Sequence, residues 1–103
     1  MPDGNEVVLI AEATALPGKR EELLRAVLDD LIPKSLAEPE VSVFRLHEDR
    51  NQRGHFMLYE RFHNRGSVES HVVAEHFSTI CKVLSELAEG GKPTLTYYAV
   101  LSD

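Results

Sequence analysis

HFMLYERF, residues 55–62, decides how this chain folds. Its even-numbered members are Phe56, Leu58, Glu60 and Phe62, and such alternation is typical of a β-strand with one buried face. Large apolar side chains dominate that face, so we expect it to point into a core. Glu60 is the exception, because burying an unpaired carboxylate costs free energy and raises its pKa. A carboxylate on this face therefore needs either a partner or a function.

The segment before it, Val41–Glu48, alternates in the same way, and the polar run Asp49–Gly54 between the two predicts a hairpin loop. We expect Glu48 to face Gly54 across the hairpin, which keeps the even-numbered residues of both strands on one face. The other expected pairs are Leu46 with Phe56, Phe44 with Leu58, and Ser42 with Glu60.

The rest of the chain supplies two further strands and two helical regions. Strands are predicted at Val7–Ala15 and Thr94–Leu101, and an amphipathic helix from Lys19 to Glu38 with a kink near Pro33. A second helical region is expected from Ser67, as its N-cap, to Ala88. The order βαββαβ predicts an α+β ferredoxin-like sandwich, with two helices on one face of a four-stranded antiparallel sheet.

That arrangement leaves the other sheet face uncovered. Its expected members are too apolar for solvent and too polar for a dry core: Val41, Val43, Arg45, Met57, Tyr59 and Arg61. A second copy of the chain, packed sheet against sheet, is the simplest cover, so a homodimer is expected.

Composition limits the kinds of partner. A length of 103 residues with 43% hydrophobic side chains fits a single domain over residues 1–103. A net charge of -6 argues against nucleic acid as a partner, and the absence of a long apolar run argues against a membrane. Cys81 is the only cysteine, which excludes an internal disulfide and a cysteine-based zinc site and fits a reducing, cytoplasmic location. No flavin, nicotinamide or phosphate-binding motif is present, so any redox chemistry is expected to proceed without a nucleotide bound by such a motif.

Glu60, His71 and His76 are the candidate catalytic residues. Glu60 either forms an ion pair with an arginine or histidine, or acts as the acid or base of an apolar pocket. His71 and His76 are five residues apart and diverge on a continuous helix, which argues against a shared metal. His76 then lies on the apolar stripe as a hydrogen-bonded core residue. If the helix breaks between them, both can face the sheet and carry protons near neutral pH. His47 and His55, expected to be cross-strand neighbours, are a weak metal signal.

At this point the chain resembles a known family, the antibiotic biosynthesis monooxygenases, and within it the quinol monooxygenases. The resemblance rests on LPGKREELL at 16–24, AEP at 37–39, FMLYERF at 56–62, and H-x4-H-F from His71 to Phe77. It implies a dimeric α/β barrel made from two ferredoxin-like units. It also implies oxidation of a quinol, anthrone or related phenolic by O2 without metal, flavin or haem, with Glu60 and His71 at pocket positions. The expected substrate-binding side chains are Phe44, Phe56, Leu58, Phe62, Val72 and Phe77.

Some residues depart from the family pattern. Glu40 stands where glycine is common and Phe62 where tryptophan is common. Haem-degrading relatives use an asparagine on the first strand, a tryptophan and a histidine, none of which this chain has at the matching places, so haem degradation is not expected. Other relatives are isomerases of small metabolites. An isomerase, a non-catalytic small-molecule binder and a protein-interface module therefore remain alternatives.

Overall fold

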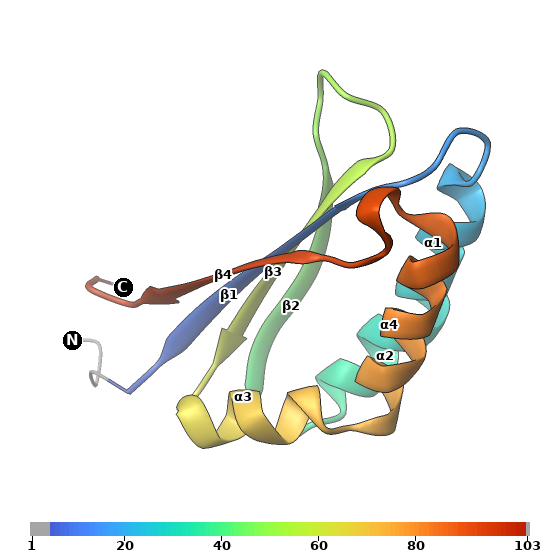
Figure 1. Cartoon of the computed structure of the whole chain (residues 1–103). Helices are drawn as coiled ribbons and strands as arrows, with labels where there is room; N and C mark the ends of the chain where they lie inside the picture. The colour runs from blue at the N-terminus through green and yellow to red at the C-terminus, as the bar shows by residue number, and fades with distance from the viewer. Residues whose placement is uncertain (1–4, 103) are drawn as a thin grey trace.

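The computed structural model describes residues 5–102 (Figure 1). Its elements in chain order are β1 (Val7–Thr14), α1 (Arg20–Ala26), η1 (Val27–Leu31), α2 (Ile32–Leu36), β2 (Val41–Glu48), β3 (His55–Phe62), α3 (Arg65–Val72), α4 (Glu75–Leu87), η2 (Glu89–Gly91) and β4 (Thr94–Ala99). The short element η1 is a π-helical segment and η2 is a single 3-10 turn.

The four strands form one antiparallel sheet in the order β2-β3-β1-β4, and all the helices lie on one side of it (Figure 1). β3 and β1 are the two central strands, and β2 and β4 form the edges. The predicted α+β ferredoxin-like fold is confirmed.

The predicted hairpin register is wrong by two residues. Phe44 pairs with Glu60 and Leu46 with Leu58, and the ladder shifts at a bulge between Val41 and Val43. A shift of two keeps each side chain on its face, because the side-chain period of a strand is two. Phe56, Glu60 and Phe62 therefore remain together on the helix-covered face as predicted, while Ser42, within the bulge, is exposed.

The first helical region is interrupted where Pro33 requires it. α1 runs into the π-helical turn η1, and α2 restarts with the proline in its first turn. Proline has no N–H to donate and its ring collides with the carbonyl four residues earlier, so a widened turn before it removes the conflict. The predicted kink is present, and the chain leaves α2 just before Glu38.

The second helical region is two helices rather than one. α3 is capped by Asn64, whose side chain accepts a hydrogen bond of 2.9 Å from the Ser67 N–H, so the prediction of Ser67 as N-cap is wrong. The helix stops at Val73, and Ala74 is extended at φ -70 and ψ 150 before α4 begins. α3 and α4 then run in clearly different directions (Figure 1). This break changes where the side chains of α3 and α4 point.

Two apolar clusters hold the layers together. The larger lies between the sheet and α1, η1 and α4, with Leu23, Phe56 and Leu84 among its buried members. The smaller joins α3 to the sheet through Val68, Leu9 and Phe62, the last two fully buried. The structure of residues 5–102 contains no helix both long and apolar enough to cross a membrane.

Candidate active site

Glu60 lies on β3 under the helices, where only 3% of its surface is exposed. Its Oε1 atom has no hydrogen-bond partner among the described residues. Burial, and secondarily the negative charge of Glu38, raise the pKa of the Glu60 carboxyl to about 8. The arginines considered as partners lie elsewhere, since Arg45 is exposed and Arg61 binds Glu6 at 2.7 Å. Glu60 is therefore a buried acid that is not held as the anion by a neighbouring cation.

His71 is the titratable side chain that lies against Glu60. Its Nε2 atom is 3.7 Å from Glu60 Oε1, too far for a hydrogen bond but within the range of an ion pair when the imidazole is protonated. The imidazole is 1% exposed, and its other nitrogen, Nδ1, lies 2.7 Å from Oε2 of Glu38. His71 thus stands between two carboxyl groups and can pass a proton from one to the other.

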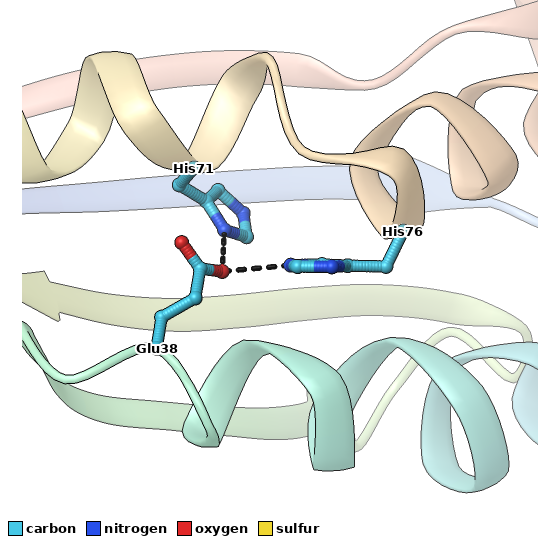
Figure 2. Close-up of side chains that lie close together, drawn as sticks. All are labelled: Glu38, His71 and His76. Atoms are coloured by element: carbon cyan, nitrogen blue, oxygen red, sulfur yellow. Dashed lines mark hydrogen bonds and ion pairs between the residues drawn. The ribbon is translucent and has the colours of Figure 1, made fainter.

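His76 joins the same cluster from the first turn of α4. Its Nε2 atom lies 2.7 Å from the Glu38 oxygen that His71 also contacts, and Figure 2 shows both imidazoles converging on that oxygen. The break at Val73 and Ala74 makes this possible, because it turns His71 toward the sheet, away from the position that a continuous helix gives it. The two histidines meet as expected for a broken helix.

Glu38 is the functional candidate that sequence reasoning missed. It follows α2 beside Pro39, in a position that reads as the end of a helix, and no local pattern distinguishes it from the other surface glutamates. Its only signal was the A-E-P match to the family, which did not assign it a role. The structure brings Glu38, His71, His76 and Glu60 together from four separate elements or loops, and we call these four residues the acid–base cluster.

Aromatic rings enclose His71 within the acid–base cluster. The ring centroids of Phe44, Phe62, His76 and Phe77 lie 5.4–5.5 Å from that of His71. Rings on several sides fix the imidazole plane and keep water from its edge, which strengthens its coupling to Glu60. The side chains predicted to surround a substrate thus pack, in part, around this histidine.

Two cavities of the described residues lie outside the acid–base cluster. A pocket of about 40 Å³ under the helices is lined by Phe56 and Leu58, among others, and has room for little more than a water molecule. A cavity of about 830 Å³ between α3 and the ends of β1 and β4 is lined by Val72, Val68 and Tyr97, among others. Neither of the two is lined by Glu60 or His71.

Glu38 and His76 are the more exposed members of the acid–base cluster. Their side chains are 20% and 13% exposed, whereas those of His71 and Glu60 are 1% and 4% exposed. The two accessible groups can accept or donate a proton at the surface, and His71 connects them to the buried acid. The arrangement is suited to general acid–base chemistry with the deep end protected from water.

The other candidates from the sequence lie outside the acid–base cluster. The prediction that His47 and His55 are cross-strand neighbours is wrong, since His47 pairs with Met57. His55 instead bonds to Thr14 at 2.7 Å and Glu12 at 3.0 Å. Burial raises the pKa of the Cys81 thiol, which agrees with a small hydrophobic side chain rather than a nucleophile.

The protein is an α+β ferredoxin-like sandwich, and it carries a histidine–carboxylate cluster beneath its helices. The model of the antibiotic biosynthesis monooxygenase family matches residues 6–83. The match covers most of the chain, so the chain belongs to the antibiotic biosynthesis monooxygenase family. Among curated proteins, no sequence matches the chain significantly.

Solved structures share the fold over nearly the whole chain. Protein Rv0793 from Mycobacterium tuberculosis is 28% identical with a TM-score of 0.85, and the alignment covers 95% of this chain and 97% of Rv0793. Protein PA3566 from Pseudomonas aeruginosa is 28% identical with a TM-score of 0.83, covering 95% and 96%. A protein from Nitrosomonas europaea, provisionally named an antibiotic biosynthesis monooxygenase, is 22% identical with a TM-score of 0.86, covering 96% and 93%.

Proposed function

We propose that this protein is a monooxygenase that oxidises a quinol, anthrone or related phenolic with O2 and needs no metal, flavin or haem. The observation that carries the proposal is the acid–base cluster, in which a buried glutamate faces a histidine that is itself bonded to a second glutamate. Membership of the antibiotic biosynthesis monooxygenase family supports the reaction class. The presence of a single cysteine supports a location in the reducing cytoplasm.

The substrate hydroxyl approaches Glu38 and His76, the partly exposed members of the acid–base cluster. Phe77 is half-buried and its ring lies 5.4 Å from that of His71, so it offers an aromatic surface beside the point of entry. A phenolic ring that stacks there places its oxygen within reach of the His76 imidazole. His71 and Glu60 then stabilise the charge that Glu38 and His76 acquire, and in this way they polarise the substrate hydroxyl further.

Proton removal starts the chemistry. The resulting phenolate or carbanion is electron-rich and transfers one electron to O2, and the two radicals combine to form a carbon–oxygen bond. For an anthrone, the peroxide formed at the methylene carbon loses water, so CH2 and O2 become C=O and H2O. The substrate supplies all the electrons, and the protein supplies a base and a water-poor site.

Oxygen uptake tests the proposal. Protein treated with EDTA is mixed with hydroquinones and anthrones in a sealed cell, beside Glu60→Gln and His71→Ala. His63→Ala is the matched control, because His63 is an exposed histidine outside the acid–base cluster. We expect uptake above autoxidation in the wild type and control, and a loss of at least tenfold in the other variants. Turnover without oxygen uptake would indicate an isomerase, and binding without turnover a non-catalytic binder.

We also propose that two copies of the chain pair through the outer sheet face. This face, defined by Val8, Ile10, Val43, Met57 and Tyr59, lies on the side opposite the helices (Figure 1). Its apolar side chains lie beside polar ones, as in interfaces between subunits. A dimer covers them and forms the barrel that the family resemblance implies.

A further inference from the structure

Three side chains of the acid–base cluster have the composition of a metal site. Glu38 offers a carboxylate oxygen, His71 its Nδ1 atom and His76 its Nε2 atom, and these atoms all lie within 4.8 Å of one another. Two imidazoles and one carboxylate are a ligand set used by zinc and by other divalent first-row metals. We propose that this protein binds one divalent first-row transition cation, such as Zn²⁺ or Co²⁺, through Glu38, His71 and His76.

The two contacts of Glu38 can open to the ligand spacing of a cation, while the imidazole nitrogens lie within 4.8 Å of each other. Both histidine nitrogens lie 2.7 Å from the same glutamate oxygen. Around an ion with bonds of about 2.0–2.2 Å, neighbouring ligand atoms are roughly 3 Å apart. A movement of well under an ångström by Glu38 therefore opens each of these contacts to the ligand spacing. Glu38 and His76 are also the partly exposed members, so the side chains that must move are the freer ones.

The position of Glu60 also supports a metal site at Glu38, His71 and His76. A histidine that binds a metal through one nitrogen usually donates its other ring N–H to a carboxylate, which fixes the ring orientation. His71 directs Nδ1 into the proposed site and Nε2 toward Glu60 Oε1, 3.7 Å away. That oxygen is buried and has no hydrogen-bond partner among the described residues. Glu60 thus lies on the side of His71 where a supporting carboxylate is found in a carboxylate–histidine–metal arrangement, and a closer approach of the two groups would form that hydrogen bond.

The backbone supports this geometry. The extended residue Ala74 separates α3 from α4, and the aromatic rings around His71 fix its plane. Three protein ligands leave at least one coordination position for water or a small ligand, and the exposed edge of the site gives access to it. The sequence spacing of five had argued against a shared metal, but that argument assumed an unbroken helix.

Metal binding is measured on the full chain, without a histidine tag, after EDTA treatment and dialysis. Zn²⁺ is titrated calorimetrically, and Co²⁺ is followed by its visible absorption, which reports nitrogen and oxygen ligands. We expect one ion per chain. Glu38→Gln and His76→Ala are expected to weaken binding at least tenfold, and Glu60→Gln by about 10–100-fold, as for other supporting carboxylates. His63→Ala is the matched control and should bind like the wild type.

Two outcomes overturn the proposal: no saturable binding of either ion, or equal affinity in the wild type, Glu38→Gln and His76→Ala. The first outcome indicates that Glu38 only accepts hydrogen bonds from the two imidazoles. Both substituted residues are partly exposed, and circular dichroism identifies any variant that fails to fold. The inference goes beyond the proposed oxygenase activity, which belongs to the metal-free protein, and does not depend on it, because the test measures binding in the absence of substrate.

Discussion

Oε1 of Glu60 lies 3.7 Å from Nε2 of His71, within a layer of aromatic rings that leaves both side chains buried. Glu60 Oε1 accepts no hydrogen bond from the imidazole at that distance, and its raised pKa comes first from burial and then from the negative charge of Glu38. A carboxylic acid with a pKa of about 8 next to an imidazole is matched to proton transfer near neutral pH. This pair distinguishes the acid–base cluster from a structural salt bridge.

Glu60→Gln should stabilise the fold while it removes activity. An acid whose pKa is raised in the folded state stabilises that state fully below its unfolded value of about 4.5, and the stability is lost as pH rises through about 8. At pH 8 the free energy of unfolding of the variant should therefore exceed that of the wild type by about 1 kcal/mol or more, since one pKa unit is worth about 1.4 kcal/mol. Urea unfolding of the EDTA-treated variant and wild type at pH 5 and pH 8 measures this difference. An equal difference at both pH values would contradict the assigned shift.

Phe62→Ala should be strongly destabilising. Phe62 is fully buried, packs against Leu9 and Val68, and contacts the His71 ring. Removing such a side chain leaves a cavity and typically costs about 3–5 kcal/mol of unfolding free energy. Leu36→Ala is the control, since Leu36 is 51% exposed and its truncation should cost less than about 1 kcal/mol. Similar losses in the two variants would show that Phe62 does not hold α3 to the sheet.

The hairpin end of the sheet should weaken in acid because of Glu48. Hydrogen bonds from Arg20, and then from the Gly54 N–H, lower the pKa of the Glu48 carboxyl to about 2. The stability that this group contributes is present above about 4.5, its usual value, and is lost as pH falls through about 2. Glu48→Gln should therefore have a flatter stability curve between pH 5 and pH 2. The unfolding temperature is measured at several pH values for both proteins. An equal fall in unfolding temperature with pH in the variant and the wild type would disprove this role.

Tyr59→Glu should separate the proposed dimer into monomers. Tyr59 lies on the outer sheet face beside Ile10, its cross-strand partner, and a charge there would be buried in a sheet-to-sheet interface. Sedimentation at several protein concentrations compares it with Leu36→Glu, which places the same charge on an exposed position of the helical layer. The wild type and Leu36→Glu should sediment as dimers. A monomeric wild type, or a dimeric Tyr59→Glu, would exclude this interface.

The fold could be predicted because its signals are local. Alternation in β3 placed Phe56, Glu60 and Phe62 on one face, and this survived a register error of two residues, which arises because Glu48 pairs with Phe56 and not with Gly54. The helix break at Val73 and Ala74 could not be foreseen, since neither glycine nor proline marks it. It is this break that brings His71 to His76.

Glu38 shows why the rest of the acid–base cluster was hidden. Its carboxylate meets the two histidines only after three elements pack together, and the sequence around it indicates a helix end and nothing more. Glu60, in contrast, was visible in the sequence because a charged residue interrupted an apolar strand face. Local patterns reveal exceptions within an element, whereas contacts between elements appear only in the assembled fold.

The fate of the oxygen atoms tests the central claim most directly. EDTA-treated protein is given an anthrone under isotopically labelled dioxygen, and the product is analysed by mass spectrometry beside Glu60→Gln and the His63→Ala control. A monooxygenase places one labelled atom in the new carbonyl group and the other in water, and the Glu60 variant should form product no faster than the uncatalysed reaction. An unlabelled product, hydrogen peroxide in place of water, or full activity in Glu60→Gln would contradict the account.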